Sequence, residues 1–200
     1  WLINASRQHE AKPFHAIIAL TNPKKHEKVL IAEEIDETTS LWCIQREKIV
    51  PRKALDLARC ARKLLNVSEE IIFIDRNFKP ELPRFSEALT CFVNFTFENN
   101  HRPRRIELHI EYKETLTEVS PPVDIWLERC SRCLSECLPE NVHLEILRWR
   151  GIDDGDKPHA RYILTEHGGI RFDYGLDEWE GDGQTTDVSL LAQSVYEKRW

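Results

Sequence analysis

The sequence contains 200 residues, of which 41% are hydrophobic and 31% are charged, and this composition is typical of a globular protein with one substantial core. Its longest apolar runs are far shorter than the roughly 20 residues of a membrane-spanning helix, so we do not expect an integral membrane protein. With 28 Lys and Arg residues against 34 Asp and Glu residues, the formal charge of -6 argues against a general nucleic-acid binder and leaves only a local basic patch for that role.

Cysteine usage points to a reducing compartment. The chain has six cysteines and lacks an N-terminal signal pattern, so we expect a cytoplasmic protein. No repeat or low-complexity tract divides the sequence. We therefore expect one domain over residues 1–200, with N-terminal strands in residues 1–50 and an α/β body in residues 51–200.

The N-terminal quarter contains three short apolar runs, and each of them predicts a strand. They are residues 14–20, 29–35 and 41–44. From residue 54 the apolar residues recur at helical spacing, with Arg and Lys on the remaining face, which predicts a helix over residues 54–65.

The body of the chain then alternates strands and helices. Residues 71–74 form a continuous apolar run that predicts a strand buried on both faces, and Asp75 and Asn77 follow it. Polar residues at the carboxyl end of such a strand are well placed for a site. The next elements are predicted as a helix over residues 84–97, a strand over 105–112, a helix over 123–138 and a strand over 142–149.

The C-terminal part predicts a hairpin and a closing helix. Residues 160–165 and 170–174 are the two hairpin strands, joined across Gly168-Gly169, and residues 189–199 have the pattern of a short amphipathic helix. Strands and helices in this order predict an α/β fold with a mixed β-sheet layered with helices.

One group of residues in the C-terminal part has the side-chain types of a catalytic or binding site. His159 and Arg161 stand where a loop rich in Gly and Asp enters the first hairpin strand, and Glu166 follows His159 by seven positions. This spacing resembles the HKD motif of the phospholipase D superfamily, with Arg161 in place of its Lys and Glu166 in place of its Asp. The longer string from His159 to Asp177 resembles the phospholipase D-like C-terminal domain of MIT-domain-containing proteins and its bacterial relatives.

The resemblance implies a phospholipase D-like half-domain that recognises phosphodiester groups, either of nucleic acid or of a phospholipid head group. It also implies a module of a larger bacterial system, such as a defence system. In the family the His is the nucleophile, so His159 and Glu166 are the catalytic candidates. Arg161 is the phosphate-binding candidate, because a guanidinium can hold two phosphate oxygens.

Further candidates flank this motif. Arg148 and Arg150 end the preceding predicted strand and would extend a phosphate-binding groove. Asp75, Asn77 and Asp177 are expected beside the site. We also expect His159 and Arg161 to share one strand face, with Asp75 at the end of a nearby parallel strand.

Two other functions stay open. An active nuclease or phosphodiesterase would use His159 as nucleophile and would need a second His motif, which a homodimer supplies. Arg161 argues against catalysis, because Arg cannot donate a proton at neutral pH, and family members with His-x-Arg in the eukaryotic branch are regarded as non-catalytic and phospholipid-binding. The other alternative is a protein-interaction domain, binding a partner domain or protein, that keeps the motif as a relic.

We expect neither a cofactor nor a metal. Cys130, Cys133 and Cys137, together with His143, have the residue types of a zinc site. Their helical spacing also fits small side chains buried on an apolar helix face, which we favour. The acidic segment from Asp173 onward does not match a calcium-binding loop, so we expect a solvated loop.

Overall fold

The computed structural model describes residues 1–11, 14–43, 45–98, 102–113, 119–135, 138–139, 142–150 and 161–200. The chain forms two compact units, Trp1–Arg46 and Glu47–Trp200. The sequence predicts a single domain whose N-terminal strands end at residue 50, and the division between the units falls close to that point. In the described part of the chain, no helix has both the length and the apolar character needed to cross a membrane.

The N-terminal unit is small and has little buried surface. Two of its strands pair in parallel, and Ile17 and Val29 at their starts are buried. Two of the three predicted strands are therefore present but shorter than expected, and residues 41–42 form a turn instead of a strand. The first helix is not predicted by the sequence, because it buries no residue and so shows no apolar stripe. The elements are α1 (Leu2–Ala11), β1 (Ile17–Ala19), β2 (Val29–Ile31) and the 3₁₀ helix η1 (Ala32–Glu34).

The second unit is built around a mixed sheet. Among the described residues, seven strands form this sheet in the order β3-β9-β8-β7-β4-β5-β6. β4, β5 and β6 run parallel to one another, and the other neighbours pair antiparallel. The elements are β3 (Glu47–Pro51), α2 (Ala54–Leu65), β4 (Glu70–Ile74), α3 (Pro83–Thr96), β5 (Arg105–Tyr112), α4 (Val123–Leu134), β6 (Glu145–Arg150), β7 (Arg161–Thr165), β8 (Gly168–Phe172), β9 (Thr185–Leu190) and α5 (Gln193–Arg199).

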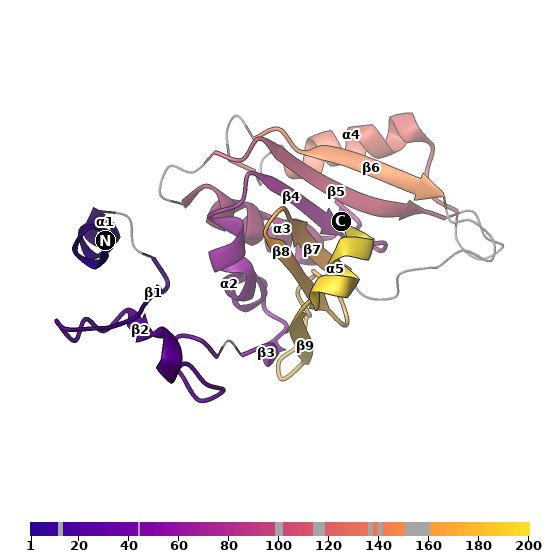
Figure 1. The fold of residues 1–200 in the computed structure, drawn as a ribbon. Coiled ribbons are helices and arrows are strands. Elements are labelled where there is room, and N and C mark those ends of the chain that lie inside the picture. Colours follow the sequence, from indigo (N-terminus) through magenta and orange to yellow (C-terminus); the bar gives the residue numbers. More distant parts are fainter. Residues whose placement is uncertain are drawn as a thin grey trace. The chain divides into compact units, whose positions relative to one another are not determined.

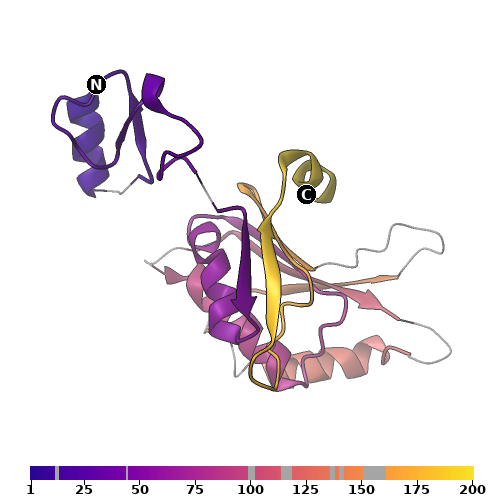
Figure 2. The same cartoon turned by 90° about the horizontal axis from the view of Figure 1, so that it is seen from below.

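Helices cover both faces of this sheet. α2, α3 and α4 lie on one face, and α5 lies on the other (Figures 1 and 2). On the α5 side, Tyr196 packs against Ile72, Tyr162 and Leu164, and its hydroxyl donates to the Thr165 carbonyl at 2.7 Å. The layers confirm the predicted fold class, an α/β fold with a mixed sheet layered with helices.

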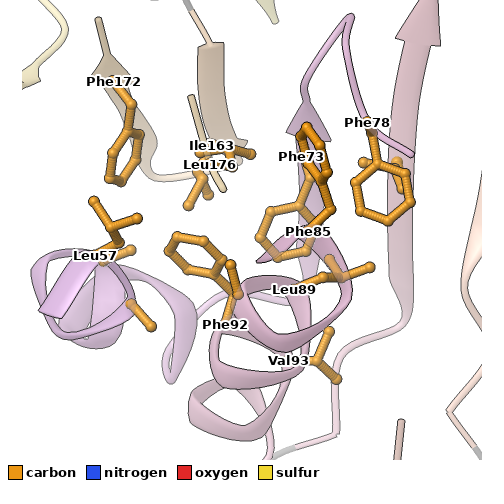
Figure 3. Close-up of a cluster of buried hydrophobic side chains, with 14 of the residues drawn as sticks. Leu57, Phe73, Phe78, Phe85, Leu89, Phe92, Val93, Ile163, Phe172 and Leu176 are labelled. Atoms are coloured by element: carbon orange, nitrogen blue, oxygen red, sulfur yellow. The ribbon is translucent and has the colours of Figure 1, made fainter. Parts of the chain in front are cut away.

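The main core lies between the sheet and helices α2 and α3. Phe92 of α3 is fully buried, and its ring centroid lies 5.8 Å from that of Phe73 on β4 and 5.9 Å from that of Phe172 on β8. Figure 3 shows Leu57 of α2 and Ile163 of β7 in the same cluster. Since these side chains come from two helices and three strands, burial of one cluster holds both layers together.

The C-terminal elements correct two sequence predictions. The hairpin of β7 and β8 is confirmed, but its turn is Glu166-His167, and both glycines belong to β8. Gly168 has a φ of 150°, which a residue with a Cβ atom rarely adopts. Residues 189–190 belong to β9, and the last helix begins only at Gln193, because Val188 alternates into the core beside Phe172 and extends the sheet by a strand.

We expect Phe92→Ala to lower the free energy of unfolding by about 3–5 kcal/mol, because it removes a fully buried ring that touches both layers. Urea denaturation followed by circular dichroism measures this loss. Leu55→Ala, at a side chain of α2 that is 45% exposed, is the control and should change the value by less than about 0.5 kcal/mol. Equal losses in the two variants would contradict this description of the core.

Candidate functional site

Four chain segments meet at one edge of the sheet. Because β4, β5 and β6 are parallel, their carboxyl ends lie at the same edge, and β7 begins there because it pairs antiparallel with β4. Ligands of open α/β sheets commonly bind outside the carboxyl ends of the strands. This edge is therefore the place to look for a site.

Asp75 and Arg161 are in contact at this edge. Arg161 Nε lies 3.5 Å from Asp75 Oδ1, and the Asp75 side chain is 1% exposed. The sequence predicts this proximity, but it expects a parallel strand pair, and β4 and β7 are antiparallel. Asp75 also accepts hydrogen bonds at 3.0 Å from the backbone N–H groups of Asn77 and Leu176. Burial raises the pKa of the Asp75 carboxyl, although these two N–H groups and Arg161 act in the opposite direction.

The turn that contains Leu176 is itself held by arginines. Asp177 is buried and accepts a hydrogen bond from Arg52 Nη2 at 2.9 Å, and its other oxygen lies 3.6 Å from Arg84 Nε. A Cβ atom on Gly175 would lie 2.0 Å from Asp177 Oδ1, so glycine is required for the close approach. Asp177 thus fixes the turn that supplies the Leu176 N–H to Asp75, and its carboxylate, which the sequence analysis grouped with the site, contacts two arginines.

A cationic pocket of about 210 Å³ opens at the same edge, after the ends of β4 and β5. Its charged lining, as far as the chain is described, consists of five cationic side chains and two carboxylates. The cations are Arg76, Lys79, Lys113, Arg129 and Arg148, and the carboxylates are Glu81 and Glu111. In a chain whose formal charge is -6, this pocket is a local concentration of positive charge.

Both carboxylates of the pocket are paired with an arginine. Glu111 Oε2 lies 2.7 Å from Arg76 Nη2, and Glu81 Oε1 lies 3.3 Å from Arg129 Nη1. Asn77, a predicted site neighbour, lines the pocket and accepts a hydrogen bond from Lys113 Nζ at 3.1 Å. Among the described lining side chains, the cations outnumber the carboxylates by three.

Arg148 is held between two aromatic rings. Its guanidinium carbon lies 4.9 Å from the Tyr112 ring centroid and 5.1 Å from that of Trp126, and Nη2 donates to the Pro121 carbonyl at 3.0 Å. Nε and Nη1 are buried and have no hydrogen-bond partner in the described part of the structure. Arg150 also stacks on Tyr112, at 4.9 Å. Arg148, which the sequence analysis grouped with the predicted site, thus lines the pocket at this edge of the sheet.

Glu166 lies elsewhere. It follows the far end of β7 from Arg161, where its two carboxylate oxygens accept the backbone N–H groups of Glu69 and Glu70 at 2.6 and 3.1 Å. These hydrogen bonds lower its pKa, although burial opposes them. Glu166 thus anchors the start of β4 and does not share a site with Arg161, contrary to its expected catalytic role beside the motif. His159 lies outside the described residues.

Among the described residues, no group of three or more His, Cys, Asp or Glu side chains is placed to hold a metal ion. Burial raises the pKa of the Cys130 thiol to about 12. Cys137, the third cysteine of the pattern, lies outside the described residues.

In the acidic segment that begins at Asp173, two carboxylates contact the same lysine: Glu178 and Asp182 each lie 3.5 Å from Lys53 Nζ.

Sequence reasoning missed four of the five cations of the pocket, the exception being Arg148. Three of these cations follow the end of a buried strand within a few residues, and this position could have identified them as candidate site residues. They are Arg76 and Lys79 after β4 and Lys113 after β5. Arg129 comes from α4 and gives no such signal, because only packing brings that helix to the edge.

No protein-family model matches the sequence, and no curated protein matches it. Several solved structures are similar to it, and two of them, both at low scores, are described below. One is that of TrmBL2, described as an archaeal chromatin protein with a novel mode of DNA binding; it is 11% identical, with a TM-score of 0.38, over 81% of this chain and 52% of that chain. The other is polyphosphate kinase from Porphyromonas gingivalis, 12% identical with a TM-score of 0.43, over 75% of this chain and 21% of that chain. The chain thus spans about half of the first protein and a fifth of the second, and neither likeness bears on its function.

Because burial raises the pKa of Asp75 in the folded protein, the folded state binds more protons than the unfolded state between the two pKa values. The stability that comes from this group is therefore present below the unfolded pKa and is lost as the pH rises through the folded pKa. We expect the stability of the wild type relative to Asp75→Asn to fall as the pH rises from 4 to 7. Urea denaturation of both proteins at each pH measures it, and a constant difference would contradict the burial of an ionisable group here.

Proposed function

We propose that the Glu47–Trp200 unit recognises phosphate or phosphodiester groups at the carboxyl edge of its parallel strands, as a phospholipase D-like domain with a degenerate HKD motif. The observation that carries the proposal is the cationic pocket, whose described lining has five cations against two carboxylates in an acidic chain. Arginine and lysine side chains converging on one cavity are what phosphate recognition requires.

The sheet topology supports placing the motif of His159 and Arg161 at the same edge as the pocket. β6 ends and β7 begins at this edge, and His159 precedes Arg161 by two residues in the sequence. Arg161 is paired with the buried Asp75, so its guanidinium is oriented before any ligand arrives. A preoriented cation loses less conformational freedom on binding a phosphate. In this proposal Arg161 borders the site, and the pocket around Arg148 holds the phosphate.

Binding to a fluorescein-labelled single-stranded DNA, followed by anisotropy, tests the proposal. We expect the logarithm of the association constant to fall linearly with the logarithm of the salt concentration. Lys79→Gln should reduce the slope by about 0.7, the value for one lost phosphate contact on a single strand. Arg59→Gln, at an exposed arginine of α2 outside the pocket, is the matched control and should leave the slope unchanged.

Vesicles of anionic phospholipid, assayed in parallel, separate a lipid ligand from a nucleic-acid ligand. Two results would refute the proposed function. One is the absence of binding to either probe, and the other is an association constant that changes neither with salt concentration nor with Lys79→Gln.

We expect binding without hydrolysis. One His motif in a chain lacks the second His that must protonate the leaving oxygen, and Arg161 cannot supply that proton. Hydrolysis of single-stranded DNA, RNA and phospholipid, together with sedimentation of the full chain, checks this. A dimer with activity that disappears in His159→Ala and rises in Arg161→Lys would support the phosphodiesterase alternative instead.

A further inference from the structure

We propose that the outer edge of β6, with the apolar groove beside it, binds an extended peptide that adds one strand to the sheet. The peptide carries a large apolar side chain for the groove and, two residues away, an acidic side chain for Arg148. The inference goes beyond the proposed function, because it concerns a polypeptide partner and does not depend on recognition of a phosphate.

The first argument is the edge itself. β6 ends the sheet, and no strand among the described residues pairs with its outer edge (Figure 1). The His109 carbonyl and the Glu111 N–H bond to the segment after β4, so the odd-numbered residues of β5 face β4 and the even-numbered ones face β6. In a parallel ladder these even-numbered residues bond the neighbours of their opposite residues, which are the odd-numbered residues of β6. The N–H and C=O groups of Ile146 and Arg148 therefore point away from the sheet.

Outward-pointing backbone groups of this kind are a template for another strand. Extended peptides bind such edges through main-chain hydrogen bonds, and pockets for alternate side chains give the specificity. The opposite end of the sheet is less suited to this, because β3 ends in Pro51 and exposes Glu47 and Lys48. β6 is therefore the edge to which we assign the partner.

The second argument is the groove, which has a volume of about 520 Å³ and a mostly apolar lining. Ile146 of β6 and Leu127 of α4 both line it, and Leu127 is 58% exposed. Arg129 reaches Glu81, just before α3, and Leu127 lies two residues earlier, on nearly the opposite side of the helix. The groove thus lies on the flank of α4 that is turned away from α3, where a strand added to β6 would pass.

The third argument is the side-chain pattern that the edge specifies. Ile146 packs against the main core and Arg148 stacks on Trp126 of α4, so both point to the α4 face of the sheet. A residue of the added strand opposite Ile146 would place its side chain at the groove. The residue opposite Arg148 lies two positions away on the same face. Among the described residues Arg148 contacts aromatic rings and one carbonyl but no carboxylate, and opposite charges in opposed residues stabilise a strand pair.

The same charges argue against a second copy of β6 as the added strand. A dyad perpendicular to the sheet preserves its two faces, so residues of equal face oppose each other in an antiparallel pair. In the two registers of greatest overlap, Arg148 lies opposite either its own copy or Ile146 of the other copy. The first opposes like charges, and the second places a cation at the apolar groove. The partner is therefore a different polypeptide.

Fluorescence anisotropy of the full chain with the fluorescein-labelled peptide Thr-Glu-Thr-Leu-Thr-Glu-Thr tests the inference. Glu stands two residues from Leu on both sides, so the peptide fits β6 in either strand direction. Replacing the Leu of the peptide by Ser should weaken binding by about tenfold or more, because the groove loses its apolar occupant. Replacing both Glu residues by Lys should weaken it by roughly threefold or more.

Protein variants and amide exchange then locate the peptide. Leu127→Ser should weaken binding about fivefold, because an apolar wall of the groove is lost. Leu55→Ser, at an exposed leucine of α2 outside the groove, is the matched control and should leave the affinity unchanged. At saturating peptide, NMR should show the N–H groups of Ile146 and Arg148 exchanging with solvent about tenfold more slowly, while that of Leu147, which faces β5, changes less.

Four results overturn the inference. They are equal binding of the Leu and Ser peptides, unchanged affinity in Leu127→Ser, unchanged exchange at Ile146 and Arg148, and a dimer in sedimentation that Leu127→Ser dissociates, which would make a second copy the occupant. None of them alters the salt dependence of DNA binding or its response to Lys79→Gln, so the proposed function is judged separately.

Discussion

The buried carboxylate of Asp75 is the interaction on which the organisation of the sheet edge depends. It follows β4, accepts the backbone N–H of Leu176 from a segment a hundred residues later, and contacts Arg161 at the start of β7. A buried carboxylate without these partners would carry a large desolvation cost, so the three segments have to meet in this arrangement. The second buried pair, Arg52 with Asp177, holds the same turn from the side of β3.

This rigid edge explains how an acidic chain presents a cationic pocket. Three carboxylates in the described part of the edge are bound to protein partners: Asp75 to backbone N–H groups and Arg161, Asp177 to Arg52, and Glu111 to Arg76. Their negative charge is thereby screened from the cavity. The aromatic rings that flank Arg148 contribute in another way, because they orient a cation without neutralising it.

The pairing of acidic groups also gives two residues of the predicted motif region a structural role. Glu166 and Asp177 resemble parts of a catalytic motif in the sequence, yet both are occupied with holding backbone or arginine groups of the fold. The described lining of the pocket at this edge is mainly cationic, and this is the basis of the proposed recognition of an anion.

The sequence by itself determined the local elements of the Glu47–Trp200 unit. The period of its apolar residues predicted α2, β4, α3 and β5 almost to the residue, because burial on one face or on both leaves a pattern within a short window. It also grouped Asp75, Asn77 and Arg148 around one predicted site, with Asp75 and Asn77 at the carboxyl end of a buried strand.

Only the tertiary structure decided the rest. The antiparallel pairing of β7 with β4, the place of Glu166 at the far end of β7, and the arrival of Arg129 from α4 at the pocket all depend on contacts between segments distant in sequence. Sequence periodicity reports how a segment is buried but not which neighbour buries it, so the site itself was decided by packing.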